Sequence, residues 1–176
     1  MVAKATKSTG GRTDPQADPV GRIMRPFYDT PGHLVRRLQQ VTQGIFESEA
    51  GSFGITPAQY AILATVKLLP GREQREIATA AGYDAVTTSQ IVRRLEAMAL
   101  LRRDKGSRSR RGHSLQLTAA GRETLARIEP AIARVQKRLM ERLPVGSRAL
   151  FLQLLSDLAG VENSHRSTGQ NKPTNY

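Results

Sequence analysis

The stretch "IATAAGYDAVTTSQIVRRLEAMALLRR", residues 77–103, contains two short helical segments separated by a glycine. A helix over about Glu73 to Ala80 precedes "GYD", and "AVTTSQIVRRLEAMAL" follows it as a second helix. On the second helix we expect the inward face to comprise Thr88, Ile91, Val92, Leu95, Met98 and Ala99. The outer face comprises Val86, Ser89, Gln90 and Arg93. Two short helices joined by a glycine turn predict a helix-turn-helix.

The hydrophobic period changes from helical to alternating after this pair of helices. Leu115 and Leu117 alternate with polar residues, and Leu101 precedes a polar stretch. This pattern predicts a two-stranded hairpin with a loop over about Asp104 to Gly112. A hairpin directly after a helix-turn-helix is the wing of a winged helix.

Positive charge is concentrated in this part of the chain. The 176 residues include 27 Lys and Arg against 15 Asp and Glu, a formal net charge of +12. Eight basic residues and two acidic ones lie between Gln90 and His113, which indicates a patch for a polyanion rather than a generally basic coat. The second helix of such a motif reads the major groove, and a basic wing suits phosphates or a minor groove. The predicted DNA contacts are Val86, Thr87, Ser89, Gln90, Arg93, Arg94, Arg108, Arg110 and Arg111. Taken separately, the polar face of the second helix and the basic run of the wing are each also compatible with an ordinary solvated surface.

Four further helical patterns lie on either side of the predicted helix-turn-helix and wing. The helix "TPAQYAILATVKLL" starts at Thr56 and Pro57 and is expected to bury Tyr60, Leu63, Ala64 and Leu68. The segments beginning at Pro31 and at Thr118 are amphipathic, and Pro130 is expected to kink the latter. The last, "VGSRALFLQLLSDLAG", is too apolar to stand exposed. These apolar faces predict a homodimer.

The predicted fold class is mostly α with a small β-hairpin wing, a winged helix-turn-helix plus a helical dimerisation lobe. The expected boundaries are a disordered arm over 1–29, a helical dimerisation region over 30–55 and 118–160, the winged helix-turn-helix over 56–117, and a flexible tail over 161–176.

Several function classes are disfavoured by what the sequence lacks. It has no cysteine, and His33, His113 and His165 are far apart. With no nucleophile motif or phosphate loop, we expect no enzyme activity, no metal site and no cofactor. The first residues lack the apolar core of a signal peptide, and no apolar run approaches membrane-spanning length, so a cytoplasmic protein without membrane contact is expected.

The chain from about His33 to Gly160 resembles the MarR family of winged-helix regulators. The similarity is carried by "TPAQYAIL", by residues 77–103 and by "SRRGHSLQLTAAGRETL". It implies a homodimer paired through its first and last helices, an inverted-repeat operator, and release by a small phenolic or aromatic ligand. Arg111 matches the wing arginine that enters the minor groove, and Ser109 stands where the family usually has aspartate. Arg72, where an apolar residue is usual, argues against a small strand before the third helix.

The resemblance also places an effector pocket between the dimer lobe and the reading head. The candidate lining residues are His33, Arg36, Arg37 and Tyr60. Arginines there suit an aromatic carboxylate or an acyl-CoA. The start of the first helical segment, "PGHLVRRLQQ", is similar to that of family members linked to aromatic compound catabolism. The sequence therefore predicts a ligand-responsive transcriptional repressor that binds double-stranded DNA. The alternative is an architectural nucleic-acid-binding protein without strong sequence preference.

Overall fold

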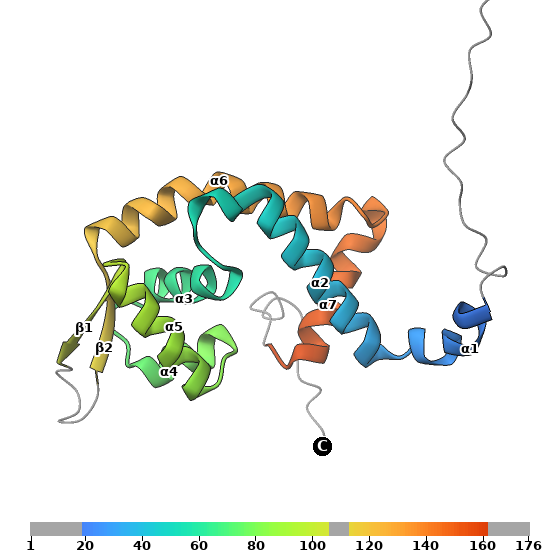
Figure 1. Cartoon of the computed structure of the whole chain (residues 1–176), viewed down its shortest axis with the longest axis horizontal. Coiled ribbons are helices and arrows are strands. Elements are labelled where there is room, and N and C mark those ends of the chain that lie inside the picture. Colours follow the sequence, from blue (N-terminus) through green and yellow to red (C-terminus); the bar gives the residue numbers. More distant parts are fainter. Residues whose placement is uncertain (1–18, 106–112, 162–176) are drawn as a thin grey trace, which may run out of the picture. The chain divides into compact units, whose positions relative to one another are not determined.

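The computed structural model describes residues 19–105 and 113–161, in two compact units. The first unit ends at Gln43, and the second begins at Gly44. The first holds helix α1 (Pro19–Tyr28) and most of α2 (Pro31–Ala50), whose last turns belong to the second (Figure 1). Helix α2 begins at Pro31, as the Thr-Pro pair predicts.

Helix α1 occupies residues that the sequence analysis assigned to a disordered arm. That expectation was wrong for residues 19–28, which form a helix with Pro19 in its first position. The helix is amphipathic: Ile23 and Phe27 lie four residues apart and therefore on the same face. The rings of Phe27 and Tyr28 contact His33 on α2, with ring centroids 4.7 and 5.2 Å from the imidazole. Aromatic contacts thus accompany this helix, although the polar composition of the segment had indicated that no helix would form.

The second unit follows the order predicted for a winged helix followed by two helices. After the short 3₁₀ turn η1 (Gly51–Phe53), its elements are α3 (Pro57–Leu68), α4 (Gln74–Ala81), α5 (Ala85–Ala97), β1 (Leu101–Lys105), β2 (His113–Leu117), α6 (Ala119–Met140), the 3₁₀ turn η2 (Val145–Ser147) and α7 (Arg148–Ala159). The described residues are therefore mostly helical, with one small antiparallel hairpin.

Helix α3 is the centre of this unit. Its start is fixed by a capping box in which the Thr56 hydroxyl accepts from the Gln59 backbone N–H while the Gln59 side chain accepts from that of Thr56. Ile62, Leu63 and Val66 are at most 1% exposed, and the helix packs against α4, α5, α6 and β2. Leu68, which we expected to be buried, is 78% exposed because it is the last residue of the helix.

Helices α4 and α5 form the predicted helix-turn-helix. Gly82 ends α4 with a φ of 73°, a left-handed conformation that favours glycine. Four of the six expected core residues of α5 are buried: Thr88, Ile91, Val92 and Leu95. Met98 and Ala99 are exposed instead, because the helix ends at Ala97 and Ala99 takes a φ of 56° that turns the chain. Leu100, 6% exposed, fills the core after that turn.

The wing is an antiparallel pair in which Leu101 faces Leu117 and Arg103 faces Leu115. A single bridge joins Glu73 to Ser114, and the Leu115 N–H donates to the Arg72 carbonyl oxygen at 2.9 Å. The described sheet therefore has two strands, as the arginine at position 72 led us to expect, and the segment before α4 adds only this isolated bridge. Its hydrogen bonds come from the backbone, so the arginine side chain does not prevent them.

Helix α6 begins at the predicted cap, where the Thr118 hydroxyl accepts from the Gly121 N–H. A Cβ at Gly121 would lie 2.1 Å from the Leu100 carbonyl oxygen, so the helix start and the α5–β1 turn approach as only glycine allows. Helix α7 follows with none of its residues buried. Within the part of the chain that is described, no helix is long and apolar enough to cross a membrane.

Candidate nucleic-acid interface

The candidate reading helix, α5, is fixed at its start by Asp84. The Asp84 carboxylate accepts from the Thr87 backbone N–H at 2.8 Å and from the Thr87 hydroxyl at 2.6 Å. These bonds, the hydroxyl first, hold the pKa of Asp84 below its usual value. The cap explains why the helix begins at Ala85. It also engages the hydroxyl of Thr87, a predicted base contact, within the protein.

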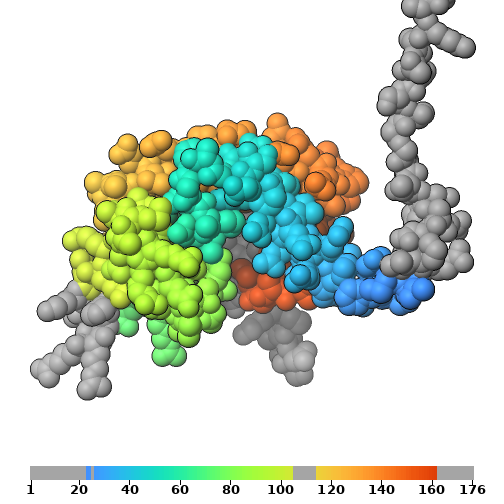
Figure 2. All heavy atoms as spheres, viewed as in Figure 1, coloured from blue at the N-terminus to red at the C-terminus, as the bar shows by residue number. Residues whose placement is uncertain are grey.

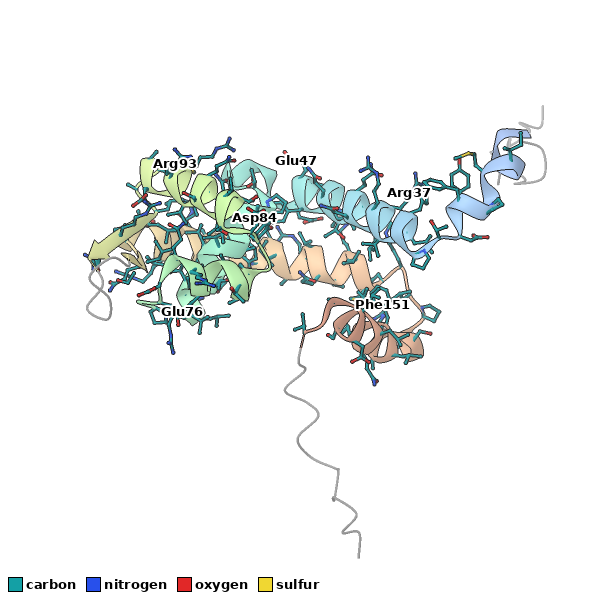
Figure 3. The ribbon with its side chains drawn as sticks, turned by 90° about the horizontal axis from the view of Figure 1, so that it is seen from below. Arg37, Glu47, Glu76, Asp84, Arg93 and Phe151 are labelled. Atoms are coloured by element: carbon teal, nitrogen blue, oxygen red, sulfur yellow. The ribbon has the colours of Figure 1, made fainter. Side chains whose placement is uncertain are left out.

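The middle of α5 presents polar side chains without protein partners. Gln90, Arg93 and Arg94 are exposed, and none makes a hydrogen bond or ion pair with another residue of the described ranges through its side chain. Figure 3 shows Arg93 projecting away from the helix, with Asp84 at the start of α5. With Ala97 they line a shallow open depression. The green residues of α4 and α5 form part of the visible surface in Figure 2.

Two more predicted contacts share this face. Val86 is 69% exposed, an unusual position for a branched apolar residue on a short helix. Ser89 is half-buried beside it. An exposed methyl group suits a thymine methyl, and a hydroxyl or an amide suits a base edge. The structure therefore brings Val86, Ser89, Gln90 and the two arginines onto one accessible face.

The base of the wing is joined to α5 by charged side chains that sequence reasoning did not single out. Arg103 on β1 pairs with Glu96 on α5, Nε to Oε2 at 3.3 Å, and is largely shielded from solvent. Arg102 pairs with Asp104 at 3.2 Å and donates to the Gln116 side-chain oxygen at 2.8 Å. Both arginines of β1 thus bind protein carboxylates. The sequence feature that could have predicted these ion pairs is the acidic residue close to each arginine, Glu96 for Arg103 and Asp104 for Arg102.

The wing tip lies outside the described residues, which resume at His113. The predicted contacts Arg108, Arg110 and Arg111, with Ser109 between them, fall in this segment.

The candidate effector residues are divided between the two units. His33, Arg36 and Arg37 lie on α2 in the first unit, and Tyr60 lies on α3 in the second. His33 is half-buried by its ring contacts, whereas Arg36 and Arg37 are exposed and Arg37 projects from the helix (Figure 3). Tyr60 is half-buried against Phe46, and burial raises the pKa of its phenol.

A carboxylate that the sequence analysis overlooked joins the end of α2 to α6. Glu49 accepts from Arg134 Nε at 2.8 Å and from Arg138 Nη1 at 2.6 Å. The two guanidinium groups lower the pKa of Glu49. Both arginines bind this one carboxylate, so we do not count them as part of the candidate interface. Among the described residues, no cluster of three or more His, Cys, Asp or Glu has the arrangement of a metal site.

Comparison with known proteins places these features in one family. The MarR family model matches residues 53–112, which run from η1 through the predicted wing tip. A proposed regulator of the hcr operon of Thauera aromatica is 33% identical over 105 residues, 60% of this chain and 63% of that protein. The transcriptional repressor NicR of Pseudomonas putida is 27% identical over 82% of this chain and 91% of its own length.

Two solved structures of one repressor, CouR, are also similar. CouR bound to a 23-mer DNA duplex is 33% identical, with a TM-score of 0.71 over 77% of this chain and 96% of that one. CouR bound to p-coumaroyl-CoA is 34% identical, with a TM-score of 0.68 over 74% of this chain and 92% of that one. The relatives are named as regulators or repressors of transcription.

Proposed function

Because this chain belongs to the MarR family of transcriptional regulators, we propose that it is a repressor that binds an inverted-repeat operator as a homodimer and is released by a small effector. The observation that carries the proposal is the free polar face of α5, where Gln90, Arg93 and Arg94 have no partner within the described residues. A helix of this kind fits the major groove, the groove in which each base pair has its own pattern of donors and acceptors.

The roles of the side chains follow from their chemistry. Gln90 and Ser89 read base edges and Val86 contacts a thymine methyl, while Arg93 and Arg94 contact phosphates or guanine. Thr87 has a structural role, because its hydroxyl already donates to Asp84. Arg108, Arg110 and Arg111 supply the wing's contacts to phosphates or a narrow minor groove.

The dimer is proposed from apolar surface. On α7 the side chains of Leu150, Leu154 and Leu158 are 56%, 57% and 70% exposed. Such a row of exposed leucines is unfavourable in water and is typical of a surface that another protein covers. Leu34 and Val35 on α2 are also exposed. Pairing of two such chains places two copies of α5 on one operator with two-fold symmetry. Half-sites about 10 base pairs apart, one helical turn, then follow.

The effector is proposed to be an aromatic acid or its CoA thioester. The CouR complex with p-coumaroyl-CoA supports this class, as do the exposed guanidinium groups of Arg36 and Arg37, which have no partner among the described residues. His33 and Tyr60 complete the candidate set. Exchange of Arg36 and Arg37 for glutamine is expected to leave operator affinity unchanged and to abolish release by the effector.

The function is tested by footprinting the DNA that flanks the gene and by measuring affinity for the protected site and for random DNA. Gln90→Ala is expected to reduce the preference for the operator by about 1–3 kcal/mol while affinity for random DNA stays the same. Gln136→Ala, an exposed glutamine on α6, is the matched control. An equal loss on operator and random DNA, or no protected inverted repeat, would instead indicate the architectural alternative.

The wing is tested by salt dependence. Arg111→Ala is expected to weaken all sequences alike and to reduce the slope of log affinity against log salt by about 0.9. An unchanged slope would mean that Arg111 does not contact DNA.

A further inference from the structure

A cavity of about 400 Å³ lies in the second unit on the side of the wing that faces α3 and α6. Its lining residues are Val66, Lys67, Pro70, Gln116, Leu117, Arg122 and Ala126. None of these belongs to the predicted DNA contacts or to the candidate effector residues. The volume lies within the range of about 300–1,000 Å³ that is typical of small-molecule sites.

The lining is divided between an apolar wall and a polar edge. Val66, Pro70, Leu117 and Ala126 supply aliphatic surface, and Val66 is only 1% exposed. The polar groups come from Lys67, Gln116 and Arg122. This division suits a ligand with an apolar body and one polar end.

The charges at the polar edge determine which polar end fits. Lys67 is already paired with Glu129 on α6. Arg122 has no acidic partner among the described residues: its Nη1 donates to the Leu117 carbonyl oxygen at 3.0 Å. The remaining N–H donors of this guanidinium form the fork that binds a carboxylate through two hydrogen bonds.

Gln116 adds a further donor. Its side-chain oxygen accepts from Arg102 Nη2 at 2.8 Å, which leaves the amide nitrogen for a second partner. The cavity edge therefore offers donors from Arg122 and Gln116, a combination that favours an anion over a neutral or cationic group.

We propose that this cavity binds a small monocarboxylate with an apolar body, for which benzoate is the probe, at a site separate from Arg36 and Arg37. The ligand contacts Gln116 and Leu117 on β2 and Arg122 on α6, so its binding acts on the base of the wing. The expected effect on DNA affinity rests on the proposed function, whereas ligand binding itself does not.

The test uses the full-length protein without DNA, titrated with benzoate while the methyl resonances of Val66 and Leu117 are followed by NMR. We expect both resonances to shift on saturation, and benzamide, which lacks the charge, to leave them unchanged. Arg122→Gln is expected to weaken benzoate binding at least about tenfold, the usual effect of losing a charge-assisted hydrogen bond. Arg127→Gln, the exposed neighbour on α6, is the matched control and is expected to bind as the wild type does.

A second variant guards against an unfolded Arg122→Gln protein. Ala126→Met fills the apolar wall without removing a charge and is expected to abolish the methyl shifts, with circular dichroism unchanged. Shifts that persist in both variants, or that vanish only when Arg36 and Arg37 become glutamine, would overturn the proposal. So would the absence of any benzoate-induced shift in the wild type.

The coupling to DNA is measured separately. Benzoate is expected to weaken operator binding by the wild type and not by Ala126→Met. If the protein does not bind an operator without benzoate, the proposed function fails while the methyl titration still decides the cavity. If it binds and benzoate changes nothing, the action on the wing is overturned.

Discussion

Helices α5 and α7 have nearly the same length, 13 and 12 residues, and each has an apolar face, yet they stand in opposite situations. Helix α5 buries Thr88, Ile91, Val92 and Leu95 within its own chain. Helix α7 buries no residue, and Leu154 and Leu158 remain more than half exposed. The difference shows that an apolar pattern predicts a buried face, but does not tell whether the same chain or another molecule covers that face. Helix α5 is covered by α3, α4 and the first strand of the wing, and for α7 we propose that a second copy of the chain supplies the cover.

The arginines show the same contrast. Arg134 and Arg138 on α6 both bind the Glu49 carboxylate, whereas Arg93 and Arg94 on α5 bind no described carboxylate. Net charge alone does not separate these pairs. Only the second pair is available to a polyanion without breaking a contact inside the protein.

The largest effect is expected in the core around α3. Ile62→Ala removes a side chain that is fully buried and leaves a cavity, at a cost of about 2–5 kcal/mol in the free energy of unfolding. Urea unfolding measures this cost. Leu68→Ala, on the same helix but 78% exposed, is the control, and a comparable loss there would contradict the assignment of the core.

The double variant Leu154→Ala, Leu158→Ala tests whether the apolar face of α7 is covered by a second subunit. If these residues are buried between two subunits, the dissociation constant of the dimer rises about a hundredfold. Analytical ultracentrifugation over a range of concentrations measures it. Gln153→Ala, on the polar face of α7, serves as the control, and a wild-type protein that sediments as a folded monomer would remove α7 from the interface.

A smaller effect is expected where α6 begins. Gly121→Ala places a Cβ against the Leu100 carbonyl oxygen, so the helix and the α5–β1 turn must separate at a cost of about 1–3 kcal/mol. Thermal unfolding detects the change. The control is Gly146→Ala, which has open space around its Cβ position and is expected to leave the stability unchanged. If the two variants lost the same stability, the close approach of Gly121 to Leu100 would not contribute to the cost.

The smallest effect concerns the cap of α5. The pKa of Asp84 is lowered in the folded state, so its ionised form stabilises the fold at neutral pH. This contribution is lost as the pH falls through the lowered pKa, where the carboxylate becomes protonated in the native state too. Asp84→Ala is therefore expected to lower the melting temperature at neutral pH, and the difference from wild type should shrink in acid. A difference that is constant from pH 7 to strongly acidic pH would contradict the ionised cap.

Much of the fold was predictable because it depends on local chemistry. The Thr-Pro start of α3, the glycine between α4 and α5, the Thr118 cap and the alternation at Leu115 and Leu117 each act over a few residues. Position 99 was mispredicted for the opposite reason. Helical periodicity continued through Met98 and Ala99, but the chain turned there so that Leu100 and Leu101 reached the core.

The candidate site was predictable in part. The exposed face of α5 follows from the same periodicity that defines its core, so the placement of Ser89, Gln90 and Arg93 outside that core was predictable from sequence. The engagement of Thr87 by Asp84, and of Arg103 by Glu96, depends on side-chain geometry that spacing does not give.

The sequence by itself determined the order of helices and strands, the exposed polar face of α5 and the excess of positive charge, because each depends on residues close together in the chain. Only the tertiary structure decided which charges are free. The Glu49 carboxylate pairs with two arginines that lie more than 80 residues away, and Arg122 keeps its guanidinium beside a cavity formed by α3, β2 and α6. Coulomb attraction depends on distance in space, and folding sets those distances.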